Sequence, residues 1–178
     1  MKILITGGTG MVGSAFKDID TKHNLVLIGS SEQDLTDYQS AFSAINEHNP
    51  DAVIHLAARV GGVKGNSDYV ADFYSDNIRI NTNVLLAAHS LGVGKVLSLL
   101  STCIYPDNAI YPLTEEQIHN GAPHQSNFGY AYAKRMLEVQ SRAYRQQYGS
   151  NFITAVPNNL FGEHDNFDLE NGHVIPSI

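Results

Sequence analysis

A tyrosine and a lysine, Tyr130 and Lys134, stand four positions apart in the segment Gly129–Lys134. On a helix, residues at this spacing lie one above the other on the same face. A lysine is positively charged at neutral pH, and a free phenol has a pKa of about 10. The charge should favour the phenolate and lower the pKa of the phenol, giving a group that exchanges a proton with an alcohol or a carbonyl oxygen. Taken alone, the spacing also fits an ordinary structural pair.

Ser101 and Cys103 follow the apolar run Val96–Leu100. The run predicts a buried strand, and active-site residues of open α/β sheets collect at the carboxyl ends of strands. A lone cysteine is more often a small buried hydrophobic residue. The position of Cys103 two residues after Ser101 favours a functional thiol.

A glycine-rich turn follows the first predicted strand, residues 2–6. Gly7, Gly10 and Gly13 come next, before a predicted helix through Phe16. One glycine permits a tight turn, another lets the main chain approach a pyrophosphate, and the last lets the helix pack closely on the strand. An ordinary glycine-rich turn is the alternative. The order of strand, glycines and helix favours a dinucleotide site, with free helix amides facing the phosphates.

The end of the second predicted strand, Leu25–Ile28, bears on the choice of cofactor. A site for NAD usually has an acid there, bonded to the ribose 2′-hydroxyl. Here Ser30 and Ser31 follow the strand, and Glu32 comes slightly later. Small hydroxyl residues leave room for a 2′-phosphate, but no arginine is present to pair with it, so the residues alone leave NADP against NAD open. Asp34 could reach the adenine amine.

Alternating strand and helix patterns position these residues. Strands are expected at residues 2–6, 25–28, 52–58, 96–100 and 152–156, and helices at 34–48, 69–90 and 129–148. The alternation predicts an α/β fold with a Rossmann-like, doubly wound parallel sheet in one domain, residues 1–178. A loop with one helical turn at 115–118 is expected before the last helix.

Three asparagines, Asn77, Asn81 and Asn83, lie in the second long predicted helix. Asparagine is a poor helix former. One or more of them could serve a site, or they could be solvated helix surface.

The composition narrows the function classes. A net charge of −7 argues against a general nucleic-acid binder. The single cysteine excludes an internal disulfide and fits a reducing compartment. The first apolar run is too short for a signal peptide, and no stretch approaches the roughly eighteen apolar residues of a membrane span. We expect a soluble cytoplasmic protein with no membrane or nucleic-acid partner.

The glycine spacing, Ser101 after the fourth strand, and the Tyr130/Lys134 pair together resemble the extended short-chain dehydrogenase/reductase family. Further motifs extend the resemblance over essentially the whole chain: Val60-Gly61-Gly62, Ser101-Thr102-Cys103-Ile104-Tyr105-Pro106, Asn127–Arg135, Gly162–Phe167 and Gly172–Pro176. The resemblance implies NADPH-dependent 3,5-epimerisation and 4-reduction of GDP-4-keto-6-deoxy-D-mannose to GDP-L-fucose by a cytosolic homodimer.

The resemblance also implies roles for five residues. Tyr130 would protonate the C4 oxygen, Lys134 would lower the pKa of Tyr130 and bond the nicotinamide ribose, and Ser101 would orient the sugar oxygen. Cys103 and His173 would be the acid/base pair at C3 and C5, in an order that is left open.

The cofactor-binding residues implied by the resemblance are Gly7, Thr9, Gly10, Met11, Val12, Gly13, Asp34, Leu35, Leu56, Ala57, Ala58, Tyr130, Lys134, Pro157, Asn159, Leu160 and His173. We expect no metal. Bacterial members tend to carry arginines where this chain has Thr9 and Ser30, so NADPH is implied by the family more than by these residues. The role of His164 is left open, and Tyr105 and Asn127 could line the sugar site or pack the loop.

Family members continue beyond residue 178, completing the sheet and adding a small carboxyl-terminal domain that holds GDP. This chain is therefore expected to correspond to the cofactor-binding catalytic domain without the substrate domain, and could be inactive alone. Two alternatives are a nucleotide-sugar epimerase or dehydratase that retains NAD, and a non-catalytic nucleotide-binding module.

Overall fold

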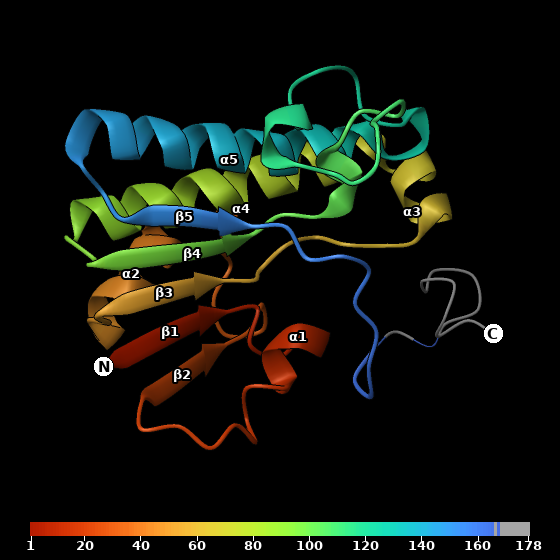
Figure 1. Cartoon of the computed structure of the whole chain (residues 1–178). Coiled ribbons are helices and arrows are strands. Elements are labelled where there is room, and N and C mark those ends of the chain that lie inside the picture. The colour runs from red at the N-terminus through yellow and green to blue at the C-terminus, as the bar shows by residue number, and fades with distance from the viewer. Residues whose placement is uncertain (166, 168–178) are drawn as a thin grey trace.

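A computed structural model of the chain describes residues 1–165 and 167 (Figure 1). The strands are β1 (Lys2–Thr6), β2 (Asn24–Ile28), β3 (Ala52–His55), β4 (Lys95–Leu99) and β5 (Phe152–Ala155). The α-helices are α1 (Met11–Ser14), α2 (Tyr38–His48), α3 (Val63–Asp68), α4 (Val70–Ser90) and α5 (Phe128–Tyr148). Three short 3-10 helices are η1 (Thr102–Ile104), η2 (Glu115–Gln117) and η3 (Gln125–Asn127).

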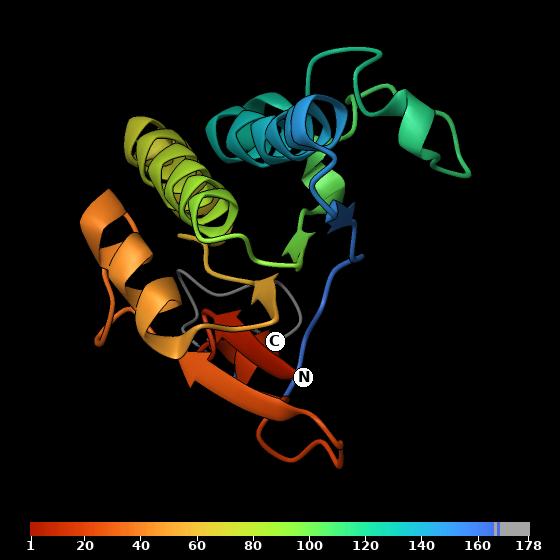
Figure 2. The same ribbon diagram turned by 90° about the vertical axis from the view of Figure 1, so that its left-hand side faces the viewer.

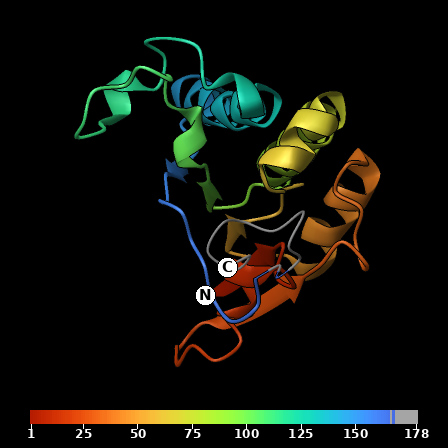
Figure 3. The same ribbon diagram turned by 90° about the vertical axis from the view of Figure 1, so that its right-hand side faces the viewer.

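The five strands form one parallel sheet in the order β2-β1-β3-β4-β5. β1 lies between β2 and β3, with Thr6 beside Ile28 on one side and beside His55 on the other. The strand order therefore reverses at β1, since β2 lies on one side of it and β3 on the other. Ligands of open α/β sheets bind at the carboxyl ends of the strands where the order reverses. Figure 3 looks onto this edge of the sheet, and the predicted Rossmann-like parallel fold is confirmed.

Three long helices, α2, α4 and α5, form a layer over one face of the sheet (Figures 1 and 2). Their inward faces carry small and aliphatic residues that suit close helix-on-sheet packing. Together with the strands they form the core: Leu4, Val53, Val96 and Phe152 from the sheet, with Ala41, Ala44, Ile45, Val84, Leu85, Ala87, Ala88 and Leu137 from the helices. This packing holds α4 and α5 against the strands whose ends carry the candidate site.

Several boundaries differ from those expected. The third strand ends at His55, three residues early, and α2 begins at Tyr38 because the Asp37 carboxylate caps its first turn. Helix α3 was not predicted, since Gly65 and Asn66 are poor helix formers. The Asn66 amide donates to the carbonyls of Gly61 and Gly62, which stabilises the entry to this helix.

Within the described part of the chain, no helix combines the length and apolarity needed to cross a membrane. The prediction for His173 falls outside the described residues.

Candidate active site

Helix α5 carries Tyr130 and Lys134 one turn apart. Its first turn packs closely on α4, because an added Cβ at Gly129 would lie 2.7 Å from the Val70 carbonyl oxygen. Lys134 is buried, and its ammonium donates to the Leu99 carbonyl at 2.9 Å. The same nitrogen lies 5.9 Å from the centre of the Tyr130 ring. The two side chains predicted to act as a pair are therefore neighbours at the carboxyl end of β4.

The prediction that the pKa of Tyr130 is lowered is wrong. Burial raises the pKa of Tyr130, and the nearby Cys103 thiolate raises it further. The Lys134 ammonium lies over the ring and is bonded to the Leu99 carbonyl. Burial also lowers the pKa of Lys134 to about 8.

Ser101 and Cys103 lie at the turn that follows β4. The Ser101 hydroxyl caps η1 by accepting from the Cys103 amide, and the Cys103 thiol donates to the same oxygen at 3.1 Å. Burial raises the pKa of the thiol, whereas the Ser101 hydrogen bond and the charge of Lys134 oppose that rise. The thiol is therefore a neutral donor whose environment already contains the groups that favour its anion.

Electrostatic coupling joins these residues into one site. When Cys103 ionises, its negative charge raises the pKa values of both Tyr130 and Lys134. The structure thus brings together Ser101, Cys103, Tyr130 and Lys134, four of the five predicted catalytic residues.

Arg135 anchors the loop that follows the thiol. Its guanidinium donates to the carbonyls of Ile104 and Gly121, the latter at 2.8 Å, and lies 5.2 Å from the centre of the Tyr132 ring. Tyr132 therefore packs beside Arg135, as expected for a residue two positions from Tyr130 on a helix.

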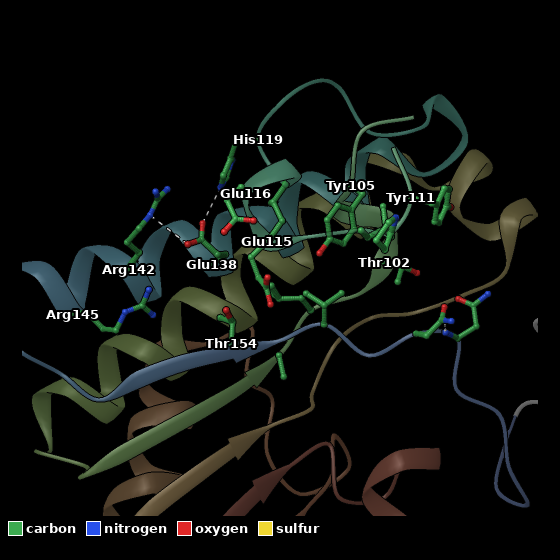
Figure 4. Close-up of a pocket in the computed structure, with 18 residues that line it drawn as sticks. Thr102, Tyr105, Tyr111, Glu115, Glu116, His119, Glu138, Arg142, Arg145 and Thr154 are labelled. Atoms are coloured by element: carbon green, nitrogen blue, oxygen red, sulfur yellow. Dashed lines mark hydrogen bonds and ion pairs between the residues drawn. The ribbon is translucent and has the colours of Figure 1, made fainter. Parts of the chain in front are cut away.

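Two cavities open beside η1. The smaller, about 260 Å³, is lined by Cys103, Tyr105 and His124 among others. The larger, about 1310 Å³, runs along β5 and α5, where Glu138 is paired with His119 and Arg142 (Figure 4). Thr102 and Tyr105 line both cavities, so the cavity beside the thiol adjoins the larger cleft.

The glycine-rich turn is packed against the sheet on two sides. Gly7 has a φ of +70°, and an added Cβ would lie 2.8 Å from the Ala57 nitrogen. An added Cβ at Gly13 would lie 2.3 Å from the Gly7 carbonyl oxygen, whereas one at Gly10 would meet only that oxygen, at 3.3 Å. The turn therefore has the close packing predicted for Gly7 and Gly13, whereas an added Cβ at Gly10 has room apart from that one contact. The first amides of α1 have no partner within the helix.

The loop after β2 carries the residues predicted for the adenosine end. The Asp34 carboxylate accepts from the backbone and hydroxyl of Thr36, at 2.9 and 2.7 Å, and these bonds lower the pKa of Asp34. The Glu32 carboxylate accepts from the Gly29 amide at 3.0 Å, at the end of β2. Glu32 thus places a negative charge where an adenosine ribose would end.

The remaining predicted cofactor residues gather at the same edge of the sheet. Leu56, Ala57 and Ala58 follow β3, and Pro157, Asn159 and Leu160 follow β5. The parallel strands bring these two segments to one side of the molecule, as Figure 3 shows.

The helix asparagines are not solvated surface. Asn77 and Asn81 are buried: Asn77 bonds both backbone groups of Arg59, and Asn81 bonds His55 and the Ala133 carbonyl. Asn83 donates to the Leu35 carbonyl. Sequence reasoning missed His55 itself. Its only signal was a polar residue inside an otherwise apolar strand.

Comparison with known proteins identifies the family of this chain. The model of the NAD dependent epimerase/dehydratase family matches residues 3–178, and the chain belongs to that family. Its similar relatives include a GDP-L-fucose synthase of Dictyostelium discoideum (47% identity) and a probable GDP-L-fucose synthase of Drosophila melanogaster (44%). Each alignment covers 99% of this chain and 57% of the relative, so the chain spans little more than half the length of these proteins.

Solved structures agree with this assignment. A crystal structure of a Naegleria fowleri GDP-L-fucose synthetase bound to NADP shares 43% identity and a TM-score of 0.89, over 98% of this chain and 59% of that one. A Campylobacter jejuni GDP-D-glycero-L-gluco-heptose synthase, solved in the presence of NADPH, has 33% identity and a TM-score of 0.89, over 99% and 52% of the two chains. The family resemblance seen in the motifs is confirmed.

Proposed function

We propose that this chain is the cofactor-binding and catalytic part of an enzyme that converts GDP-4-keto-6-deoxy-D-mannose to GDP-L-fucose. The observation that carries the proposal is the Cys103 thiol, 3.1 Å from the Ser101 hydroxyl, at the end of the strand whose Leu99 carbonyl holds the Lys134 ammonium beside Tyr130. A ketone reductase needs a proton donor for the oxygen, and an epimerase needs groups that exchange protons on carbon. Both kinds of group lie in one site here.

The epimerisation uses the acidity that the 4-keto group gives to the protons on C3 and C5. One member of the Cys103/His173 pair removes a proton from the carbon, and the electron pair moves to the C4 oxygen as an enolate. The other member returns a proton to the opposite face, so the step is balanced. Hydrogen bonds from Ser101 and Tyr130 stabilise the charge on the C4 oxygen.

The reduction uses the same hydroxyl groups. NADPH, when bound, supplies the hydride that C4 accepts. Tyr130 gives its proton to the C4 oxygen, and the ketone becomes an alcohol. Because burial raises the pKa of Tyr130, the phenol enters this step protonated. Lys134 lies close enough to stabilise the phenolate that remains.

The residues of this chain fit the proposed cofactor. The space beside Gly10 and the free amides of the first turn of α1 suit a pyrophosphate. Asp34 and Leu35 would hold the adenine, and Lys134 would bond the nicotinamide ribose. The NADP in the Naegleria fowleri relative supports NADPH as the cofactor.

The test is NADPH oxidation with GDP-4-keto-6-deoxy-D-mannose. This chain, joined to the carboxyl-terminal region that the relatives possess, should oxidise one NADPH for each GDP-L-fucose formed. The chain alone should be much slower, because we propose that the joined region forms the GDP-binding domain. Absence of turnover in the joined protein would contradict the proposal.

The Glu32 carboxylate at the end of β2 is the observation that favours an alternative, a nucleotide-sugar epimerase that retains NAD. Such a protein would be purified with NAD bound and would turn over without consuming NADPH. Release of the cofactor on denaturation, followed by its identification, distinguishes the two functions. A chain that binds NADPH but stays inactive when joined would instead be a nucleotide-binding module.

We further propose a cytoplasmic homodimer, as the resemblance implies. Light scattering during size-exclusion chromatography of the joined protein tests the dimer, and a monomer across the concentration range would contradict it. Fractionation of cells that express the protein tests its location.

A further inference from the structure

A buried row of polar groups crosses the molecule from the sheet to α5. Thr6 and His55, the last residues of β1 and β3, are both fully buried and lie side by side in the sheet. The Thr6 hydroxyl lies 2.8 Å from His55 Nδ1, and His55 Nε2 lies 3.1 Å from Asn81 Oδ1 on α4. The Asn81 amide nitrogen then reaches the Ala133 carbonyl of α5 at 3.3 Å.

The direction of each hydrogen bond follows from the last one. A carbonyl can only accept, so the Asn81 nitrogen faces Ala133 and its oxygen faces His55. His55 must then carry its proton on Nε2, which leaves Nδ1 to accept from the Thr6 hydroxyl. The Thr6 oxygen in turn accepts from the Ala57 amide at 3.4 Å.

His55 has no role as a proton carrier. Burial, together with the charge of Lys134, lowers the pKa of His55 to about 3, and the bond to Asn81 opposes this only in part. The groups around it are the hydroxyl of Thr6, the amide of Asn81, the charge of Lys134 and, on β4, the neighbouring residue Ser98. The imidazole is therefore neutral over the working pH range, and its two nitrogens serve as one fixed acceptor and one fixed donor.

The two ends of the row are the two halves of the candidate site. Ala57 packs directly against Gly7 of the glycine-rich turn. Ala133 immediately precedes Lys134, whose ammonium is held separately by the Leu99 carbonyl. Asn81 thus links the backbone next to Lys134 to His55 on β3 and, through His55, to Thr6 on β1. The side chain of Lys134 is held by β4.

We propose that His55 is a positioning residue for Lys134, which it places relative to the carboxyl ends of β1 and β3 through Asn81. The proposal rests on the proposed catalytic role of Lys134. Its test, however, needs neither cofactor nor turnover, so it can fail while the proposed function stands, and the reverse.

The test is a pH titration of the lysine ε-carbons of this protein by NMR. Lys134 should titrate near 8 in the wild type, apart from the exposed lysines. His55→Leu fills a similar volume but leaves Thr6 and Asn81 without their His55 partner, so water should enter to satisfy them, reach the ammonium and raise the pKa of Lys134 by about half a unit or more. His55→Gln can accept from Thr6 and donate to Asn81, and should restore the wild-type value.

Val53→Ala is the matched control, because Val53 is buried two residues earlier on the same face of β3. It should lower the melting temperature and leave the Lys134 titration unchanged. If His55→Leu lowers the melting temperature and likewise leaves Lys134 unchanged, His55 is only a packing residue and the proposal is overturned.

Thr6→Val provides a second route should His55→Leu fail to fold. It removes only the donor to Nδ1, so the ring should stay in the Nε2–H form that the Asn81 oxygen imposes, while the ¹⁵N signal of Nδ1 shifts because that nitrogen loses its hydrogen bond. Unchanged ring signals, or an Nδ1–H tautomer in the wild type, would contradict the directed row and overturn the proposal.

Discussion

At the scale of single residues, burial shifts the pKa values of the groups in the site so that their neutral forms are favoured. Cys103 and Tyr130 have raised pKa values, and Lys134 has a lowered one, all chiefly through loss of water. The pattern is common at sites that move protons, although buried structural networks also produce it. The buried ammonium therefore has a measurable cost in stability.

Lys134→Met should stabilise the fold at neutral pH while removing the proposed activity. The folded pKa of about 8 lies below the ordinary 10.5, so between these values the unfolded chain binds more protons and stability rises with pH. Below pH 8 both states are protonated and the full cost is present, about 3 kcal/mol as an upper limit from the two pKa values.

Urea unfolding of the wild type and Lys134→Met at pH 7 and near pH 10 measures this effect. The advantage of the variant should shrink as the pH rises. The exposed Lys95, changed to Met, serves as the control and should show no such pH dependence. An advantage that stays constant with pH would mean that Lys134 is not destabilised by burial.

Glu32 should set the balance between the two cofactors. Its carboxylate is fixed on the Gly29 amide, where a 2′-phosphate would approach. Glu32→Gln removes a repulsion of about 1 kcal/mol, so the affinity ratio for NADPH over NADH should rise about fivefold. Fluorescence titration of both cofactors measures the ratio. Glu47→Gln is the charge-matched control, because Glu47 is exposed and lies near the carboxyl end of α2, away from this loop. An equal rise in both variants would rule out a local role.

At the scale of elements, different glycines of the glycine-rich turn are expected to serve packing and cofactor binding. An added Cβ at Gly13 would overlap Gly7 and Gly8, whereas one at Gly10 has room apart from a 3.3 Å contact. Gly13→Ala should therefore lose about 1–3 kcal/mol of stability together with NADPH binding. Gly10→Ala should keep most of its stability and lose binding alone.

Chemical denaturation and NADPH titration on the same two variants check this expectation. Equal stability losses would show that the turn has no side open to a ligand. Normal NADPH binding by Gly10→Ala would show that the phosphates do not lie beside that residue.

The sequence was sufficient for the elements whose signals are local. The apolar runs and helix patterns located all five strands and the three long helices, and the glycine spacing located the turn. Helix α3 was missed because its own residues are weak helix formers. The Thr6–His55–Asn81 row was missed because its hydrogen bonds join residues 49 and 26 positions apart, which only the folded sheet brings together.

The orientation of Lys134 was missed for the same reason. Helical spacing placed it beside Tyr130, but its ammonium is bonded to the Leu99 carbonyl, 35 positions away. Spacing on one helix therefore predicted the pair, whereas the Leu99 carbonyl on the neighbouring strand fixes the position of the ammonium.

At the scale of the whole molecule, the proposed cofactor side and the proposed sugar side meet at the carboxyl edge of the sheet. The turn after β1 and the loop after β2 supply the first, and the segment after β4 together with α5 supplies the second. The larger cleft runs from the second along β5 (Figure 4). The parallel strands thus carry both proposed halves at the same end of the sheet.

The most direct test is a crossed comparison of Cys103→Ser and Tyr130→Phe in the joined protein, in deuterated water. Entry of deuterium at C3 and C5 reports epimerisation, and NADPH oxidation reports reduction. Cys103→Ser should suppress deuterium entry while an already epimerised substrate is still reduced. Tyr130→Phe should lose reduction by about 10²-fold or more, while deuterium entry is slowed much less because Ser101 still stabilises the C4 oxygen. Equal loss of both activities in both variants would contradict the assignment of separate roles within one site.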